Sequence, residues 1–364
     1  MIYEGNTKLT NWRLLPVLEW GTGDARSPHA IVQKLVTSMS LADRLHYYRR
    51  IFKAYLLPGK SQLTFWHETP QLNSAASVTQ VGEYYMLFSE KANYRGVHDS
   101  AGIPMLDYHG RIGPQYNPIA IAQWGLGNYN FYCCAHESER KKRFLSASDW
   151  LCSHLEQNPF GLWVWNHHFD WEYRTTLRAP WYSGLAQGQG LALLVRAYRE
   201  TRSQIYLDAA ERAFAAFLKS TEEGGVAFTD ERGDLWFEEY IVSPPTHILN
   251  GFMWASWGVY DYFLATKDKA AQRLFEAAVR TLHANLDRYD LGFWSLYEQS
   301  VTRLPMVASA FYHKLHIVQL QVMHRLTGDE IFARYAERWA NYAQSRGKRT
   351  RALCYKCAFK LCYY

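Results

Sequence analysis

Residues 236–254, WFEEYIVSPPTHILNGFMW, join an extended aromatic run to a turn and a helix start. The run ends in Glu238, Glu239 and Tyr240, and the Pro244-Pro245 pair that follows cannot continue in a helix. A strongly apolar helix is predicted from about Thr246. Two carboxylates and a tyrosine should therefore end a strand beside a helix start, where rigid elements can hold reactive groups. The alternative is that Tyr240 only packs in an aromatic hairpin.

The same arrangement recurs along the chain with a period of about 65 residues. First helices are predicted to begin near Tyr116, Tyr182, His247 and Tyr312. Each leads through a polar joint into a second helix whose apolar residues fall at i, i+3, i+4 and i+7. Short aromatic strands are expected to follow three of these helices, at residues 162–165, 236–240 and 293–297.

The two kinds of helix differ in their apolar surface, which predicts the architecture. The first helices are apolar nearly all round, as expected of helices buried on every side, and the second are one-sided. We therefore predict a mainly α fold, an incomplete (α/α) toroid with short β-hairpins gathered at one end, the active face. The expected domains are an N-terminal cap (1–110, irregular, with a short helix and strands), the catalytic toroid (111–346) and a basic tail (347–364).

The tail matches none of the repeated helices, so we expect it to be disordered. Cys354 and Cys357 form a CxxC pair with only Cys362 nearby, whereas a structural zinc site needs four ligands. No metal or other cofactor is expected.

Composition narrows the class of protein. Of the 364 residues, 16% are aromatic, which suits a cleft that stacks on sugar rings as well as it suits a thick core. The net charge of +6 is spread along the chain, which favours an anionic partner but shows no nucleic-acid footprint before the last twenty residues. No apolar run reads as a signal peptide or a membrane span, and six scattered cysteines are no disulfide framework. A cytoplasmic protein is expected.

Polar residues interrupt the first two turns of the inner helices. They are Gln187, Gln189, Asn250, His313 and His316. An unsatisfied buried polar group costs about 1–3 kcal/mol, so each needs either an internal hydrogen bond or a ligand. Their shared place at one end of the ring makes them candidates for substrate binding.

Three tyrosines gather at the same end: Tyr240, Tyr297 and Tyr312. A phenol with a pKa near ~10 is a good proton donor to a developing carbanion. Tyrosines on opposite faces of one carbon suit removal of a proton from one side and its return from the other. That carbon becomes acidic beside a carboxylate whose charge is neutralised. The candidates for a cationic clamp on that carboxylate are Arg178, Arg303 and Arg111. The alternative for each arginine is that it is simply exposed to solvent. Tyr182 is a further candidate for substrate binding.

Several motifs resemble a known family. WYSGLAQGQG, EEY followed by ILNGFM, and YHKLHIVQLQ are similar to the C-terminal helical domain of the D-glucuronyl C5-epimerases, over roughly residues 102–345. The resemblance implies an (α/α) toroid in which three cleft tyrosines serve epimerisation. By motif they fall on Tyr240 in EEY, Tyr297 in SLYE and Tyr312 in FYH, with Glu239 beside the first. This chain lacks the β-rich insertion and membrane anchor of the animal enzymes, and no basic residue closely follows Tyr297.

These observations predict a glucuronyl C5-epimerase that inverts D-glucuronate to L-iduronate within heparosan or N-sulfated heparosan. Homodimerisation is left open, and neither nucleic acid nor a membrane is an expected partner. A polysaccharide lyase on the same toroid is the nearest alternative. Others are an inverting glycosidase that pairs Glu239 with Asp170, and a glycan-binding toroid without catalysis.

Overall fold

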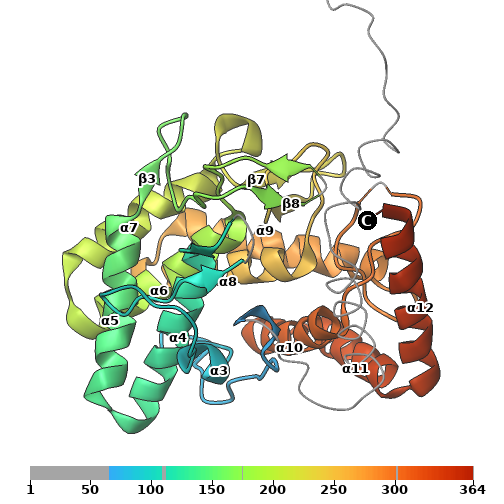
Figure 1. Cartoon of the computed structure of the whole chain (residues 1–364), viewed down its shortest axis with the longest axis horizontal. Helices are drawn as coiled ribbons and strands as arrows, with labels where there is room; N and C mark the ends of the chain where they lie inside the picture. The colour runs from blue at the N-terminus through green and yellow to red at the C-terminus, as the bar shows by residue number, and fades with distance from the viewer. Residues whose placement is uncertain (1–64, 109–111, 174, 301, 364) are drawn as a thin grey trace, which may run out of the picture.

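The computed structural model describes residues 65–108, 112–173, 175–300 and 302–363. Within this part of the chain, four helical hairpins form the frame of the molecule (Figure 1). Their helices are α4 Pro118–Ala135 with α5 Ser138–Ser153, α6 Gly184–Thr201 with α7 Gln204–Phe214, α8 Leu249–Thr266 with α9 Lys269–Asn285, and α10 Ala310–Thr327 with α11 Glu330–Gln344. Short 3-10 turns extend α7 (Ala215–Leu218) and α9 (Leu286–Tyr289).

The first helix of each hairpin lies on the inside of an incomplete ring. Neighbouring inner helices contact each other in the order α4, α6, α8, α10, and each contacts its own outer helix. The inner helices begin within two residues of the predicted starts. The predicted fold class, an incomplete (α/α) toroid, is therefore confirmed.

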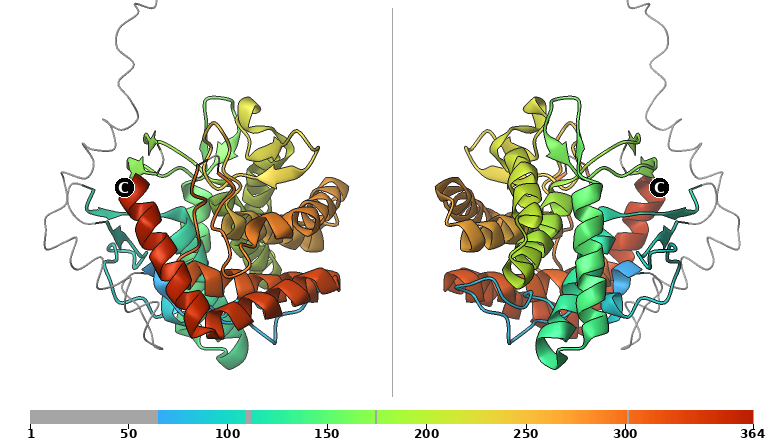
Figure 2. Two further views of the ribbon diagram at one scale, coloured as in Figure 1. Left: turned by 90° about the vertical axis from the view of Figure 1, so that its right-hand side faces the viewer. Right: turned by 90° about the vertical axis from the view of Figure 1, so that its left-hand side faces the viewer.

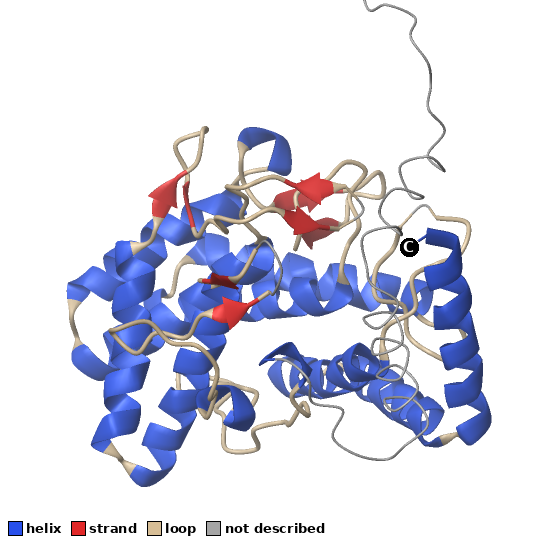
Figure 3. Cartoon of the chain, in the orientation of Figure 1, coloured by secondary structure: helices blue, strands red, loops and turns tan. Residues whose placement is uncertain are grey.

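Short antiparallel hairpins gather on one side of the helices (Figure 3). They pair β1 Leu106–Asp107 with β2 Pro114–Gln115, β3 Glu156–Gln157 with β4 Trp163–Val164, β5 Trp171–Glu172 with β6 Thr176–Leu177, and β7 Ala227–Thr229 with β8 Leu235–Phe237. The strand predicted at 293–297 is replaced by isolated bridges, Asp290 with Ser295 and Leu296 with Val307. That stretch still leads into α10 as expected.

Helices α6 and α8 pack so closely that no side chain would fit at the glycines between them. A Cβ at Gly188 would lie 2.5 Å from the Cα of Ala255, and one at Gly258 would lie 2.1 Å from the carbonyl oxygen of Gly188. The two helices therefore meet backbone to backbone at these glycines.

The segment before α4 belongs to the ring. Arg325 at the end of α10 donates to the carbonyl oxygens of Asn73, Ser74 and Ala76, while the Asn130 amide of α4 donates to the carbonyl of Met86. This segment, with the 3-10 turn Phe65–His67 and α3 Ser89–Ala92, thus bridges the last inner helix to the first. The short helix predicted near residues 42–56 lies outside the described residues.

Fully buried charges tie this segment to the ring. The Nη1 atom of Arg196 lies 2.6 Å from Oδ2 of Asp261, and the Tyr85 hydroxyl donates to Oδ1 of Asp261 at 2.7 Å. The Nε atom of Arg196 donates to the carbonyl oxygen of Gly82. The free-energy cost of removing Arg196 and Asp261 from water is offset by their opposite charges and by these hydrogen bonds.

The prediction that the tail is disordered is wrong, because Arg346–Tyr363 form a helix, α12. In Figures 1 and 2 this helix rises from the end of α11 beside the loops that precede α10. Ala352, Leu353 and Phe359 are buried, which gives the helix an apolar face that its basic and cysteine residues obscure in the sequence. Among the described residues, no helix is both long and apolar enough to cross a bilayer.

Replacing Gly258 by Ala should lower the free energy of unfolding by about 1–3 kcal/mol, because the added methyl group must push α6 and α8 apart. Urea denaturation measures the change. The matched control is Gly347→Ala in α12, where a Cβ meets nothing within 4 Å and higher helix propensity should stabilise by up to about 1 kcal/mol. Equal stability of the Gly258 variant and the wild type would contradict the packing described.

Candidate active site

The EEY motif is held directly against the starts of two inner helices. The Gly184 amide of α6 donates to the Glu238 carbonyl oxygen at 2.8 Å. A Cβ at Gly251, near the start of α8, would lie 2.2 Å from a carboxylate oxygen of Glu239. Both helices therefore present bare backbone to the motif, which brings Glu239 and Tyr240 to the end of the ring.

Four tyrosines from four separate segments meet there in two pairs. The rings of Tyr240 and Tyr173 have centroids 4.5 Å apart, and Trp181 packs on Tyr240 at 5.7 Å. Tyr297 and Tyr312 form the second pair, with centroids 4.8 Å apart. The structure thus brings the three predicted tyrosines together, and we call these four residues the tyrosine cluster.

Glu239 lies beneath the cluster with an altered acidity. Its side chain is 5% exposed, and its Oε2 atom accepts a hydrogen bond from the Asn250 amide at 3.3 Å. Burial, followed by the charge of nearby Glu298, raises the pKa of Glu239 to about 8, against hydrogen bonds from Tyr240 and Asn250 that lower it. Such a carboxylate can exchange a proton near neutral pH.

Two further buried carboxylates surround Glu239. Glu298 is fully buried and accepts a hydrogen bond from the Tyr173 hydroxyl. Glu238 contacts the Nδ1 atom of His247 at 2.5 Å, and the His247 carbonyl oxygen accepts from the Tyr289 hydroxyl. Three carboxyl groups therefore lie close together in a place that water scarcely reaches.

The tyrosines keep their protons at neutral pH. Burial raises the pKa of Tyr240, Tyr297 and Tyr312 above the ordinary value of 10, and in all three the charge of Glu239 raises it further. Each is therefore a phenol, able to donate a proton, until a partner takes that proton away.

Other predicted site residues hold the scaffold instead. The Gln187 amide is buried and bonded to the backbone of Trp163, Trp165 and Ala213. The Gln189 amide donates to the Tyr84 hydroxyl, on the inside of the ring. Neither side chain is exposed, and the substrate-binding role predicted for both stays a prediction.

The two predicted histidines are likewise enclosed. Ser295 lies between them, with its Oγ atom 2.8 Å from Nδ1 of His313 and 3.0 Å from Nδ1 of His316. His313 also stacks on Trp294, and burial lowers its pKa to about 3. Both histidines are fully buried and neutral, and the binding role predicted for them stays a prediction.

Of the three arginines predicted for the carboxylate clamp, the two that the structure describes lie at the surface. The Arg178 side chain is 77% exposed and pairs with Asp170, and Arg303 is exposed as well. Arg111 lies outside the described residues. Tyr182 donates its hydroxyl to the Gly224 carbonyl oxygen, which fixes the loop before β7.

Sequence reasoning missed Tyr173 and Glu298, two neighbours of the cluster. Tyr173 ends the sequence Trp171-Glu172-Tyr173, which repeats the aromatic–carboxylate–tyrosine order of the EEY motif. Glu298 directly follows Tyr297. The repeated order was the available signal for Tyr173, whereas nothing in the sequence marks Glu298 as buried.

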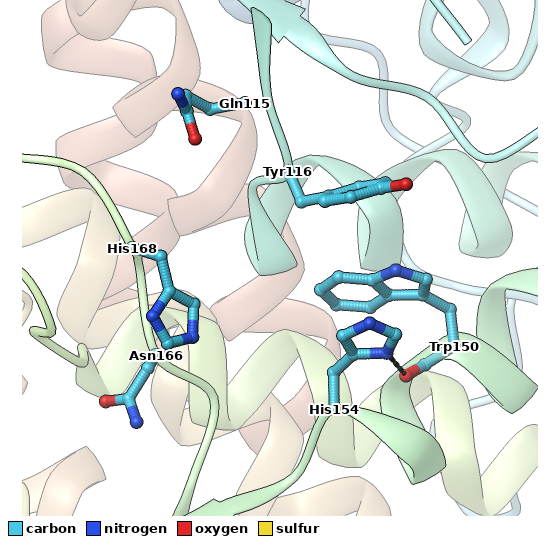
Figure 4. Close-up of a pocket in the computed structure, with 6 residues that line it drawn as sticks. All are labelled: Gln115, Tyr116, Trp150, His154, Asn166 and His168. Atoms are coloured by element: carbon cyan, nitrogen blue, oxygen red, sulfur yellow. Dashed lines mark hydrogen bonds between the residues drawn. The ribbon is translucent and has the colours of Figure 1, made fainter. Parts of the chain in front are cut away.

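A separate pocket opens beside the hairpins (Figure 4). Tyr116, Trp150 and His154 form one wall, with the last two rings stacked at 4.0 Å. Gln115, Asn166 and His168 face them, and Glu156 binds the side chains of Asn166 and His168. His167 stacks on Trp181, which in turn contacts Tyr240, so aromatic rings connect this region with the cluster.

The sequence of this chain matches a known protein family and two relatives. The family described as D-glucuronyl C5-epimerase C-terminus matches residues 157–341, slightly more than half of the chain. A D-glucuronyl C5-epimerase from Caenorhabditis elegans is 32% identical over 224 residues, which cover 57% of this chain and 36% of that protein. An uncharacterized protein from Methanocaldococcus jannaschii is 28% identical over 198 residues, covering 54% of this chain and 63% of its own length. This chain thus matches less than two thirds of either relative.

A solved structure, a GH76 alpha-mannanase from Bacteroides thetaiotaomicron, superimposes with a TM-score of 0.43 at 12% identity, over 65% of this chain and 59% of that one.

The fold is an incomplete (α/α) toroid with clustered tyrosines and a buried carboxyl group at one end. The chain belongs to the D-glucuronyl C5-epimerase family, as its motifs predict. The matched range contains Glu239 and all four residues of the tyrosine cluster. Their roles in this chain remain predictions.

The raised pKa of Glu239 predicts a pH-dependent stability. Between the ordinary value of 4.5 and about 8, the folded protein holds a proton that the unfolded chain has released. Stability should therefore fall as the pH rises through this range, with a slope of about 1.4 kcal/mol per pH unit from this group. Glu239→Gln removes that slope. In urea denaturation the free energy of unfolding of the variant, relative to that of the wild type, should therefore rise between pH 5 and pH 8. Parallel curves would contradict the raised pKa.

Proposed function

We propose that this protein is a glucuronyl C5-epimerase that acts within a heparosan-like polysaccharide. The observation that carries the proposal is the placement of Glu239, with its pKa of about 8, under two pairs of protonated tyrosines. Family membership and the similarity to the worm epimerase support the reaction class.

In this mechanism Tyr240 and Glu239 remove the C5 proton together. The Tyr240 oxygen takes the proton from C5 while its own proton passes to the ionised Glu239 carboxylate, with which it shares a hydrogen bond. The electrons of the broken C–H bond move into the substrate carboxylate, which becomes an enediolate. A phenol of the Tyr297–Tyr312 pair then donates its proton to C5 from the opposite face and becomes a phenolate. Before the next turnover Glu239 releases the proton it holds to solvent and the phenolate takes one up, which restores both groups.

The alternatives differ in their chemistry. A lyase would also abstract the C5 proton but would then expel the C4 oxygen and leave a double bond that absorbs ultraviolet light. An inverting glycosidase needs a second carboxylate, yet Asp170 is bound to surface Arg178 whereas Glu239 is buried. That difference weighs against the glycosidase.

Exchange at C5 tests the reaction. Heparosan incubated with the protein in deuterated water should gain deuterium at C5 and iduronate signals in NMR spectra, without an ultraviolet-absorbing product. Because Glu239 must be ionised, kcat/KM should rise with pH up to about 8. If the polymer remains free of deuterium, the epimerase proposal is excluded and a glycan-binding protein without catalysis is favoured.

Tyr240→Phe should lower the exchange rate by at least a factor of about 100, in the usual range for a proton-transfer group. Polysaccharide binding should persist, because the ring remains. Tyr198→Phe removes the same hydroxyl near the far end of α6 and should leave exchange unchanged. Equal rates for both variants would remove Tyr240 from the mechanism.

A further inference from the structure

The pocket in Figure 4 lies outside the tyrosine cluster and has one aromatic wall. The space between its lining residues is about 360 Å³, part of it open to solvent. The wall consists of Tyr116, Trp150 and His154, and the last two rings are stacked at 4.0 Å with only 10° between their planes. Flat aromatic surfaces of this kind stack on the apolar C–H face of a pyranose ring. The wall is therefore suited to a sugar.

This wall is held rigidly from behind. The Tyr116 hydroxyl donates a hydrogen bond to Oδ2 of Asp99 at 2.7 Å, and Nδ1 of His154 lies 2.9 Å from the Trp150 carbonyl oxygen (Figure 4). Trp150 is 9% exposed, so most of its ring is anchored in the core. Side chains that are already fixed lose little conformational entropy when a ligand binds, which favours binding.

Polar side chains lie opposite the wall and are fixed as well. The Gln115 amide donates to the Ile112 carbonyl oxygen at 2.8 Å. The Asn166 amide donates to Oε2 of Glu156 at 2.8 Å, and Nε2 of His168 lies 3.2 Å from Oε1 of the same carboxylate. The side-chain oxygens of Gln115 and Asn166 are hydrogen-bond acceptors. Such acceptors match the hydroxyl groups that surround a sugar ring.

The charges beside the pocket determine which sugar it can hold. None of its six lining residues is a lysine or an arginine. The side chains of Glu156 and Asp99, which bond to lining residues, are both acidic. They would repel the carboxylate of a uronate, whereas an uncharged ring would not be repelled. Heparosan alternates glucuronate with N-acetylglucosamine, so it offers an uncharged ring beside every uronate.

One short stretch of chain joins the pocket to the tyrosine cluster. Asn166 and His168 line the pocket, and Tyr173, five residues after His168, packs on Tyr240. Five residues span at most about 18 Å. The two places are therefore close enough for an oligosaccharide of a few sugars to occupy both.

We propose that this pocket is a glycan subsite that holds an uncharged sugar ring, N-acetylglucosamine in heparosan, while a uronate of the same chain lies at the tyrosine cluster. The placement of the uronate rests on the proposed function, whereas recognition of an uncharged ring does not.

Binding of a neutral oligosaccharide tests the pocket without any reaction. Chitotriose, which consists of N-acetylglucosamine alone, is added to the isotope-labelled full-length protein. NMR follows the indole N–H signal of Trp150, assigned by its loss in Trp150→Phe. The signal should shift in a saturable way with chitotriose and stay in place with trigalacturonate, which carries a carboxylate on every ring. No saturable shift with chitotriose, or an equal shift with trigalacturonate, would overturn the inference.

A variant of the wall checks that the sugar lies in the pocket. His154→Ala removes an exposed ring and should raise the Kd for chitotriose about fivefold, as expected for the loss of one aromatic contact. The matched control is His136→Ala, because His136 is also exposed and contacts a ring, that of Tyr132 at 5.7 Å, but follows the opposite end of α4. The control should leave Kd unchanged. An unchanged Kd in His154→Ala would place the sugar elsewhere and refute the subsite.

Kinetics then separates the two proposals. If the wild type catalyses exchange in heparosan, His154→Ala should raise KM about fivefold and leave kcat unchanged, because a subsite remote from the reacting carbon binds substrate and transition state equally. An active wild type whose KM is unaffected by His154→Ala contradicts the subsite and leaves the proposed function standing. A wild type that binds chitotriose in the pocket without catalysing exchange refutes the proposed function alone.

Discussion

The structure depends on bare backbone at the inner helices. Gly188 and Gly258 let α6 and α8 touch backbone to backbone, and Gly184 and Gly251 let the EEY segment rest on the starts of those helices. A methyl group at any of the four would meet an atom closer than 3 Å. The spacing of the helices and the position of Glu239 therefore depend on the same device, glycines on α6 and α8 that leave the backbone uncovered.

That depth gives Glu239 its chemistry. A glutamate at the surface is ionised throughout the neutral range, whereas burial beside Glu298 brings the pKa of Glu239 close to that range. The same burial keeps the tyrosines protonated. Burial thus gives the site both a carboxyl group that titrates near neutral pH and phenols that stay protonated.

The sequence predicts the fold well and the site in part. Helix starts, the inner and outer layers and the meeting of Tyr240, Tyr297 and Tyr312 follow from apolar patterning, Pro-Pro punctuation and family motifs. Polar residues on inner helices were harder to interpret, because Gln187 and His313 satisfy their hydrogen bonds within the protein. A pattern of residues cannot say which way a side chain points. Helix α12 was not predicted, because the basic residues and cysteines of the tail obscure the apolar face that docks it.

The bridge between Arg325 and residues 73–76 joins parts of the chain that lie about 250 positions apart. Such contacts close a very long loop, and the chain loses the conformational entropy of that loop before the contact can stabilise it. The segment at residues 73–86 can take its final place only once the last inner helix has formed. Until then the buried pair of Arg196 and Asp261 lacks the hydrogen bonds that Tyr85 and Gly82 provide.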